Sequence, residues 1–319
     1  MKIAILDDYA NCALTLAEWS GLGAEITVFR DTITDHAGLV ARLAPFDVIC
    51  LMRERTPFGA DLIGALPNLK LLVTSGPRNA AIDLNAAKAR GVVVCGTESR
   101  KTTTSELAML MILALNRGLM TEVGSLTAGG WQAGLGRDLA GLTLGVIGLG
   151  NIGAQMAALG RAFGMDVVAW SQNLTDERCD ELGVGRMDSL PALMAAADVS
   201  TVHLVLSDRS RGLVGAEAFA AAKVGHVFIN TSRGPIVDTA ALLAGLRAGR
   251  PAMAGLDVFD AEPLPVDNPL RDATLIESGR LLLTPHLGYT TQATFEVFYR
   301  QSVEAVAAWA AGAPIRQLA

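Results

Sequence analysis

The chain has 319 residues, too long for one compact core, so two domains are expected, and with 51% hydrophobic and 18% charged residues it has ample apolar material to bury. Its net charge of −6 argues against nucleic acid or an anionic membrane surface as the main partner. The first apolar run stops at Asp7 and Asp8, unlike a signal peptide, and the longest run, Leu107 to Leu115, is too short to cross a bilayer.

The first third of the chain alternates β runs with helical patterns. Helical patterns are expected over 11–19, 36–42 and 82–90, and strands over Lys2–Leu6, Glu25–Phe29, Val48–Leu51, Leu71–Thr74 and Val92–Cys95. This alternation predicts a parallel sheet with helices on both faces. The turn 75–79, Ser-Gly-Pro-Arg-Asn, follows the fourth strand, where such sheets bind ligands, although an ordinary loop is the alternative.

Near residue 99 the alternation of strands and helices gives way to one long apolar helical pattern. Thr103 and Glu106 have capping-box spacing, which predicts that a helix begins there. The helix is apolar on most sides, so we expect it to pack between domains or subunits. Residues 118–141 lack clear periodicity, and we expect an arm that leads into the second domain.

A glycine motif opens the second domain. Gly148, Gly150 and Gly153 fit G-x-G-x-x-G between a β run and an alanine-rich helical pattern over 154–163, and a second β run covers 167–170. The first glycine permits a tight turn, the second lets a diphosphate approach the backbone, and the third lets helix and strand pack closely. The helix N-terminus offers unpaired N–H groups to the anion. The pattern therefore predicts dinucleotide binding, with a glycine-rich packing turn as the alternative.

Further β runs complete the second domain, over Val199–Leu204, Val227–Asn230, Ala252–Leu256 and Leu281–Thr284. The amphipathic tail 294–311 follows the last strand and can return to the first domain. The predicted fold is α/β, with two doubly wound parallel-sheet domains, of which the second is a Rossmann nucleotide-binding domain inserted into a discontinuous substrate domain. The expected boundaries are 1–98 with 288–319 for the substrate domain and 99–287 for the dinucleotide-binding domain.

Reactive side chains follow three strands of the second domain. Arg233 comes after one strand, Asp257 and Glu262 after the next, and His286 after the last. Parallel strands present their C-terminal ends on one edge, so these side chains can converge beside the nucleotide. An arginine can grip a carboxylate, a histidine can exchange a hydroxyl proton, and a carboxylate can orient the histidine. Alone, Asp257 could cap a loop, Glu262 could be solvated, and His286 could be structural; their joint placement favours an active site.

Cysteine and histidine usage predicts no metal site. The four cysteines are far apart in the sequence, and no His/Cys pair has ligand spacing. Buried free thiols in a reducing, cytoplasmic location are expected.

At these motifs the chain resembles the D-isomer-specific 2-hydroxyacid dehydrogenase family over nearly its whole length. The likeness lies in the segments 55–58, 75–83, 148–153, 230–234, 257–263 and 284–288. It implies an NAD(P)-dependent interconversion of a 2-oxo acid and a D-2-hydroxy acid, in which Arg233 binds substrate and cofactor, Glu262 pairs with the histidine, and His286 is the acid/base. It also implies a homodimer formed through residues 103–140.

The resemblance further implies which residues line the ligands. The substrate carboxylate is expected at the backbone of Ser75 and Gly76, with Arg53 and Arg78 nearby. Asp257 is expected near the nicotinamide carboxamide. The full expected cofactor set is Gly148, Gly150, Asn151, Ile152, Gly153, Ser171, Thr104, Leu204, Thr231, Ser232, Asp257 and Gly288.

One departure from the family pattern concerns the cofactor. Ser171 occupies the place of the acid that binds the adenosine ribose in NAD-preferring members, and no arginine follows directly, although Arg178 comes several residues later. NAD is the expected cofactor, with NADP left open. A nucleotide-sensing scaffold or co-repressor of the same fold is the alternative function. A formate dehydrogenase is disfavoured because its relatives carry glutamine at the position of Glu262, and a short-form phosphoglycerate dehydrogenase stays open.

Overall fold

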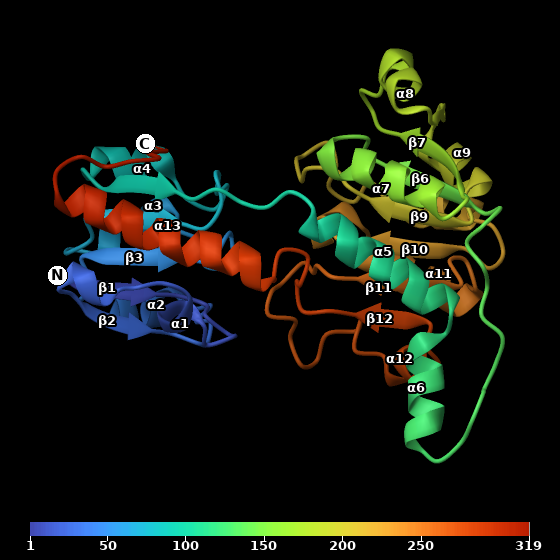
Figure 1. Cartoon of the computed structure of the whole chain (residues 1–319), viewed down its shortest axis with the longest axis horizontal. Helices are drawn as coiled ribbons and strands as arrows, with labels where there is room; N and C mark the ends of the chain where they lie inside the picture. Colours follow the sequence, from blue (N-terminus) through green and yellow to red (C-terminus); the bar gives the residue numbers. More distant parts are fainter. Residues whose placement is uncertain (319) are drawn as a thin grey trace. The chain divides into compact units, whose positions relative to one another are not determined.

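The structure, a computed structural model, describes residues 1–318, which divide into two compact units (Figure 1). One unit contains Met1–Arg100 and the chain from Thr290 onward, and the other contains Lys101–Tyr289. The divisions fall about two residues beyond the expected ones at 98 and 288. Each unit is built on one parallel sheet, so the prediction of two parallel-sheet α/β domains is confirmed.

The first unit has the strand order β2-β1-β3-β4-β5 among its described residues. Every residue of β3 and β4 is buried, as expected for strands covered on both faces. Helices α2 (His36–Leu43), α3 (Ala60–Ala65) and α4 (Leu84–Ala89) contribute to one apolar core, and α13 (Gln292–Ala310) packs against β4 and β5. The strands are β1 (Lys2–Ile5), β2 (Glu25–Val28), β3 (Val48–Leu51), β4 (Leu71–Thr74) and β5 (Val93–Gly96).

The second unit has the order β12-β11-β10-β9-β6-β7-β8 in the part of the chain that the structure describes. From β6 the chain first adds β7 and β8 on one side and then β9 to β12 on the other. Sheets of this kind bind ligands at the switch point between the two sides, next to the first strand. The strands are β6 (Thr143–Ile147), β7 (Asp166–Trp170), β8 (Gly185–Arg186), β9 (Val199–Val202), β10 (Val227–Asn230), β11 (Met253–Leu256) and β12 (Leu281–Leu283).

Helices cover both faces of the second sheet. The first core includes α5 (Thr103–Asn116), α7 (Asn151–Ala162) and α8 (Asp176–Leu182), and Figure 1 shows α5 and α7 side by side on one face. The second core includes residues of α9 (Leu190–Ala196), α10 (Ala216–Ala221), α11 (Thr239–Ala248) and α12 (Ala273–Glu277). His226, the residue before β10, is buried; Ser200 and the carbonyl of Ala197 contact its ring, and burial lowers its pKa to about 4, so it is a neutral packing residue.

Some local expectations were wrong. Helix α5 begins at Thr103, as expected, but the capping box does not form, because Thr102 is the N-cap and no side chain caps this helix. The expected helix over 11–19 shortens to α1 (Ala13–Leu16) followed by a 3-10 turn, η1 (Ser20–Leu22). The unpatterned arm contains α6 (Leu119–Thr127), which begins after Gly118 in a left-handed conformation.

The short elements α3 and β8 were also missed. No single helix within residues 1–318 is long and apolar enough to cross a membrane. Taken together, α5 and α6 have the length and apolar composition of a membrane span, but they are bent by 62° relative to each other, and length and composition are the only features that suggest a span.

Candidate active site

The glycine motif forms a tight turn between β6 and α7. Gly148 has φ +102°, and a side chain there would lie 2.8 Å from the carbonyl oxygen of His203. A side chain at Gly153 would collide with the carbonyl of Gly148, so helix and turn can pack this closely only around glycine. Space is open at Gly150, the N-cap of α7, which has no side-chain cap, so the first N–H groups of α7 face a site that can hold a diphosphate. Asn151 and Ile152 form the first turn of this helix.

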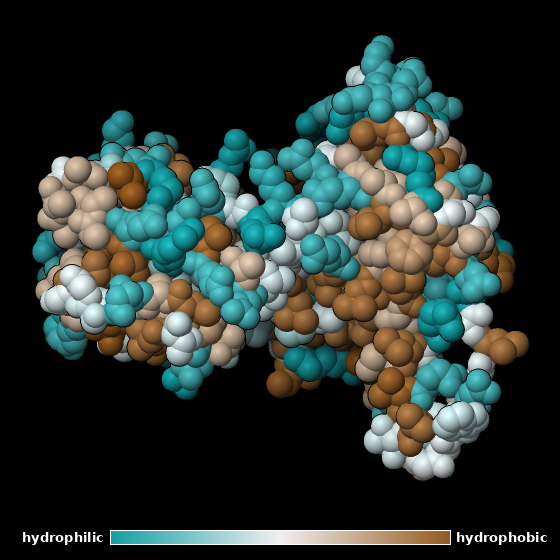
Figure 2. All heavy atoms as spheres, viewed as in Figure 1, coloured by the Kyte–Doolittle hydropathy of each residue, from teal (hydrophilic) through white to brown (hydrophobic). Residues whose placement is uncertain are grey.

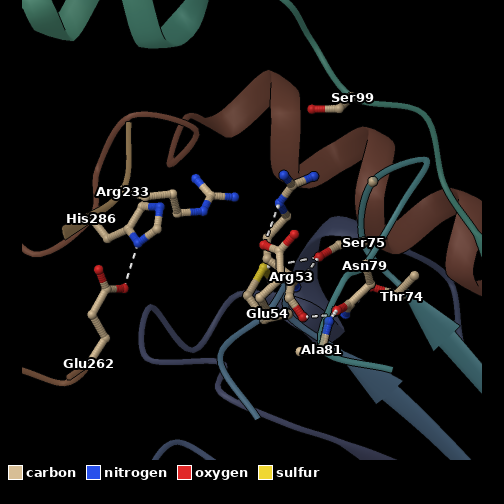
Figure 3. A network of polar contacts seen from close by, with 12 residues as sticks. Arg53, Glu54, Thr74, Ser75, Asn79, Ala81, Ser99, Arg233, Glu262 and His286 are labelled. Atoms are coloured by element: carbon tan, nitrogen blue, oxygen red, sulfur yellow. Dashed lines mark hydrogen bonds and ion pairs between the residues drawn. The ribbon is translucent and has the colours of Figure 1, made fainter. Parts of the chain in front are cut away.

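Three neighbouring strands bring the expected reactive side chains to one edge of the second sheet. Strands β10, β11 and β12 are adjacent, with Asn230 beside Leu256 and Leu256 beside Leu283. Asp257 follows β11 directly, and Arg233 and His286 come three residues after the ends of β10 and β12. Figure 3 shows Arg233 and His286 projecting from adjacent loops of this unit, with Glu262 on the other side of the imidazole.

The imidazole of His286 is fixed by a carboxylate. Its Nδ1 lies 2.5 Å from Oε2 of Glu262, and the other oxygen, Oε1, accepts the N–H of Phe259 at 2.9 Å. The two side chains are only 17% and 18% exposed, and the ring of Tyr289 packs edge-on against the imidazole at 5.2 Å. Because Glu262 occupies Nδ1, it holds that nitrogen protonated and leaves Nε2 as the atom that can exchange a proton with a ligand.

Asp257 holds the loop that carries His286. Its Oδ1 accepts the hydroxyl of Thr284 and the N–H of Leu287, both at 2.6 Å, and its Oδ2 accepts the N–H of Gly288 at 2.8 Å. The side chain is fully buried, and burial raises the pKa of its carboxyl although these hydrogen bonds oppose the rise. His286 has φ +54°, a left-handed conformation that a non-glycine residue holds only when its surroundings impose it.

This arrangement predicts that Asp257→Asn destabilises the protein and its loop. An amide nitrogen would replace one of the accepting oxygens and leave a backbone N–H facing a donor, at a cost of about 1–3 kcal/mol. We expect the free energy of unfolding in urea to fall by about 2 kcal/mol. The matched control is Asp260→Asn, an exposed residue of the same loop. Equal stability of the two variants would contradict the clamping role of Asp257.

The loop after β10 is shaped by a close backbone approach. A side chain at Gly234 would overlap the backbone of Phe259, so glycine lets the β10 and β11 loops touch. Arg233 precedes it, and its Nη1 donates to the carbonyl of Ser232 at 2.8 Å.

Four of the other expected cofactor residues form two hydrogen-bonded pairs between separate segments of the second unit. Ser232 donates its hydroxyl to the carbonyl of Leu204, and Thr104, on α5, donates its hydroxyl to the carbonyl of Gly288 at 3.2 Å. The hydroxyl of Thr231 is buried and, among residues 1–318, has no hydrogen-bond partner. A buried, unpaired hydroxyl is costly, so Thr231 fits a position that a ligand completes. Thr103 has the same property and was not anticipated, because its sequence context indicated only a cap.

A separate polar cluster occupies the first unit, at the C-terminal ends of β3 and β4. Arg53 has φ +53°; its N–H donates to Oγ of Ser75 at 2.9 Å and its carbonyl accepts Nδ2 of Asn79 at 2.6 Å (Figure 3). Its guanidinium lies over Gly76, where any side chain would collide with it. The structure thus brings Arg53, Ser75 and Gly76 together.

Two features of this cluster differ from the expected site, in which backbone N–H groups and arginines bind the substrate carboxylate. The N–H groups of Ser75 and Gly76 already donate, to the carbonyl of Leu51 at 3.0 Å and to Oγ1 of Thr97 at 2.7 Å. Arg78 is exposed in the same turn, and within residues 1–318 it makes none of the hydrogen bonds that join the cluster. Asn79 was not among the expected site residues, and its place in the turn 75–79 was the available signal.

Metal binding finds no support in the part of the chain that the structure describes. No group of three or more His, Cys, Asp or Glu side chains could hold a metal ion within residues 1–318. The cysteines are free, and Cys50, Cys95 and Cys179 are buried.

Comparisons with known proteins show that the chain is similar to dehydrogenases. Residues 109–288 match the model of the D-isomer specific 2-hydroxyacid dehydrogenase, NAD binding domain. The chain is 37% identical over 276 residues to a D-3-phosphoglycerate dehydrogenase of Bacillus subtilis, with 86% of this chain and 51% of the relative covered. It therefore spans about half the length of the curated relatives it matches.

Solved structures agree over the whole length. A phosphoglycerate oxidoreductase from Vibrio cholerae has a TM-score of 0.90 and 36% identity, covering 98% of this chain and 100% of the other. A D-lactate dehydrogenase from Aquifex aeolicus in complex with NAD and lactic acid has a TM-score of 0.79 and 25% identity, covering 97% and 96%.

Proposed function

The chain belongs to the D-isomer specific 2-hydroxyacid dehydrogenase family, as its motifs predicted, and we propose that it interconverts a 2-oxo acid and a D-2-hydroxy acid. Its cofactor is NAD, which supplies the hydride acceptor and donor when bound. The observation that carries the proposal is the 2.5 Å pair of His286 with Glu262 at the strand edge that also carries Arg233.

In this proposal His286 is the acid/base. Nε2 takes the proton of the substrate hydroxyl during oxidation and returns it during reduction, while Glu262 holds the ring in place. Arg233 grips the carboxylate and the carbonyl oxygen through its planar fork. These three roles need no further protein group at the reacting carbon.

The proposal also assigns the binding residues. Lys101–Tyr289 is the dinucleotide-binding domain and the other unit is the substrate domain, where the turn of Ser75 and Gly76 lines the substrate carboxylate site and Arg53 and Arg78 supply its positive charge. The proposed cofactor contacts are those of the glycine motif together with Thr104, Ser171, Leu204, Thr231, Ser232, Asp257 and Gly288. The free thiols support a cytoplasmic location.

The test is a panel of 2-oxo acids with NADH and with NADPH. Glyoxylate, pyruvate, hydroxypyruvate, phenylpyruvate and 3-phosphohydroxypyruvate are mixed with pure protein, and the loss of absorbance at the reduced nicotinamide band is followed. We expect oxidation of the reduced nicotinamide with at least one acid, and a rate about 10²–10⁴-fold lower with the His286→Ala variant. Tight NAD(H) binding without turnover on any acid would instead favour a nucleotide-sensing scaffold or co-repressor.

We also propose a homodimer formed through the second unit. Apolar side chains are exposed along α6 and the arm after it, and Figure 2 shows apolar surface over α5 and α6. Exposed apolar patches of this kind mark protein interfaces. The exposed residues are Leu110, Leu119, Met120, Val123, Leu126, Trp131 and Leu135.

Light scattering coupled to gel filtration tests the dimer. Twice the monomer mass is expected for the wild type, and Leu126→Glu with Val123→Glu should yield monomers because two charges would be buried in an apolar contact. The control is Val224→Glu, an exposed apolar residue elsewhere on the same unit. A wild-type monomer at micromolar concentration would refute the dimer.

A further inference from the structure

The end of β7 lies against the glycine motif. The N–H of Gly148 donates to the carbonyl of Trp170 at 2.9 Å, so Ser171, the next residue, lies at the turn that receives the dinucleotide. In dinucleotide-binding units a carboxylate near this place accepts the adenosine ribose 2′-hydroxyl and repels a 2′-phosphate. A serine hydroxyl carries no charge and can donate to a phosphate oxygen, so this repulsion is missing here.

Arg178 reaches the same turn from α8. Its Nε donates to the carbonyl of Leu149, the central residue of the Gly148–Gly150 turn, at 3.4 Å. Its Nη1 pairs with Glu181 at 2.6 Å, and its side chain is 35% exposed. The backbone N–H of Arg178 donates to Oγ1 of Thr175, the N-cap of α8, which fixes the first turn of that helix. A guanidinium is thus held at the glycine turn by contacts on two sides.

The acidic residues around Arg178 indicate that the site can accept the 2′-phosphate of NADP(H) but does not require it. Helix α8 also carries Asp176, Glu177 and Asp180, and Glu181 already shares the charge of Arg178. The other nearby arginine, Arg186, pairs with Asp176 at 3.4 Å and with Asp188 at 3.9 Å. One arginine among acids can attract a 2′-phosphate without making the phosphate necessary for binding.

We propose that Arg178 and Ser171 form a binding site for the ribose 2′-phosphate, so that the protein binds NADP(H) as well as NAD(H). The inference deepens the proposed function and rests on it only for the presence of a dinucleotide site. It concerns binding and is independent of which acid is turned over.

Calorimetric titration of the 319-residue chain with NAD⁺ and with NADP⁺ tests the site. The measured quantity is the ratio of the two dissociation constants in the wild type and in variants of equal thermal stability. Arg178→Ala should weaken NADP⁺ by about tenfold or more and NAD⁺ by less than about twofold, since a hydrogen bond to a charged group carries this selectivity. Arg186→Ala removes the same charge from the same unit and should leave the ratio unchanged.

Two further variants should move the ratio in opposite directions. Ser171→Asp restores a carboxylate beside the ribose and should weaken NADP⁺ by about tenfold or more relative to NAD⁺. Glu181→Gln releases Arg178 from its acidic partner and should strengthen NADP⁺.

Two results would contradict the proposed 2′-phosphate site. Wild-type protein that binds NAD⁺ but not NADP⁺ does so, as does a ratio that Arg178→Ala changes by less than about fivefold. Absence of turnover with normal dinucleotide binding defeats the proposed oxidoreductase and leaves the 2′-phosphate site standing. Absence of binding by either dinucleotide defeats both.

Discussion

Replacing His286 by alanine is expected to lower kcat by about 10²–10⁴-fold, the usual loss when a positioned acid/base is removed. NAD⁺ affinity should stay within about threefold of the wild type, because the glycine turn and its helix remain intact and supply the phosphate contacts. Steady-state kinetics with the best acid of the panel, and calorimetry with NAD⁺, measure the two effects.

His36→Ala is the matched control, because His36 is an exposed histidine at the start of α2. It should retain wild-type turnover. A His286→Ala enzyme with near wild-type kcat would falsify the acid/base role, whatever its affinity for NAD⁺.

Glu262→Gln separates orientation from acid/base chemistry. The amide can keep the N–H of Phe259 as donor to its oxygen, but it then presents an NH₂ group to Nδ1 of His286. The ring would turn or change tautomer, so kcat should fall by about tenfold to 10³-fold, less than for loss of the histidine itself.

The strands were predictable because of how parallel sheets are buried. Runs such as Val48–Leu51 and Val227–Asn230 are apolar at nearly every position, since both of their faces are covered, and the structure has strands with these same bounds. The strand-end rule then brought Arg233, Asp257 and His286 to one edge without any knowledge of the loops.

The contacts that give those residues their geometry were not predictable. Asp257 is bonded to Leu287 and Gly288, which lie some thirty positions further along the chain, and no local pattern encodes such a pairing. The reach of Arg178 back to Leu149 depends on where α8 begins. Helix α6 was missed although its apolar residues, Leu119, Met120, Val123 and Leu126, recur at helical spacing.

Replacing Arg233 by alanine is expected to lower kcat/KM for the 2-oxo acid by about 10²–10³-fold, as charge-assisted hydrogen bonds to a carboxylate contribute about 1.5–3 kcal/mol each. The loss should appear in both KM and kcat, because in the proposed site the guanidinium contacts the carboxylate in the ground state and the carbonyl oxygen as charge develops on it. The backbone of the loop should survive, since Gly234 and not the arginine side chain allows its approach to Phe259.

Two variants make this prediction specific. Arg233→Lys keeps the charge but loses the planar fork, so it should recover only part of the lost kcat/KM. Arg247→Ala removes an exposed arginine of α11 that pairs with Asp272 at 3.0 Å, and should leave kcat/KM unchanged. If Arg233→Ala matched this control, Arg233 would lie outside the site, and the carboxylate would have to be held by the arginines of the first unit, Arg53 foremost, where its guanidinium covers Gly76. Kinetics of Arg53→Ala with the same acid would then decide between the two arginines.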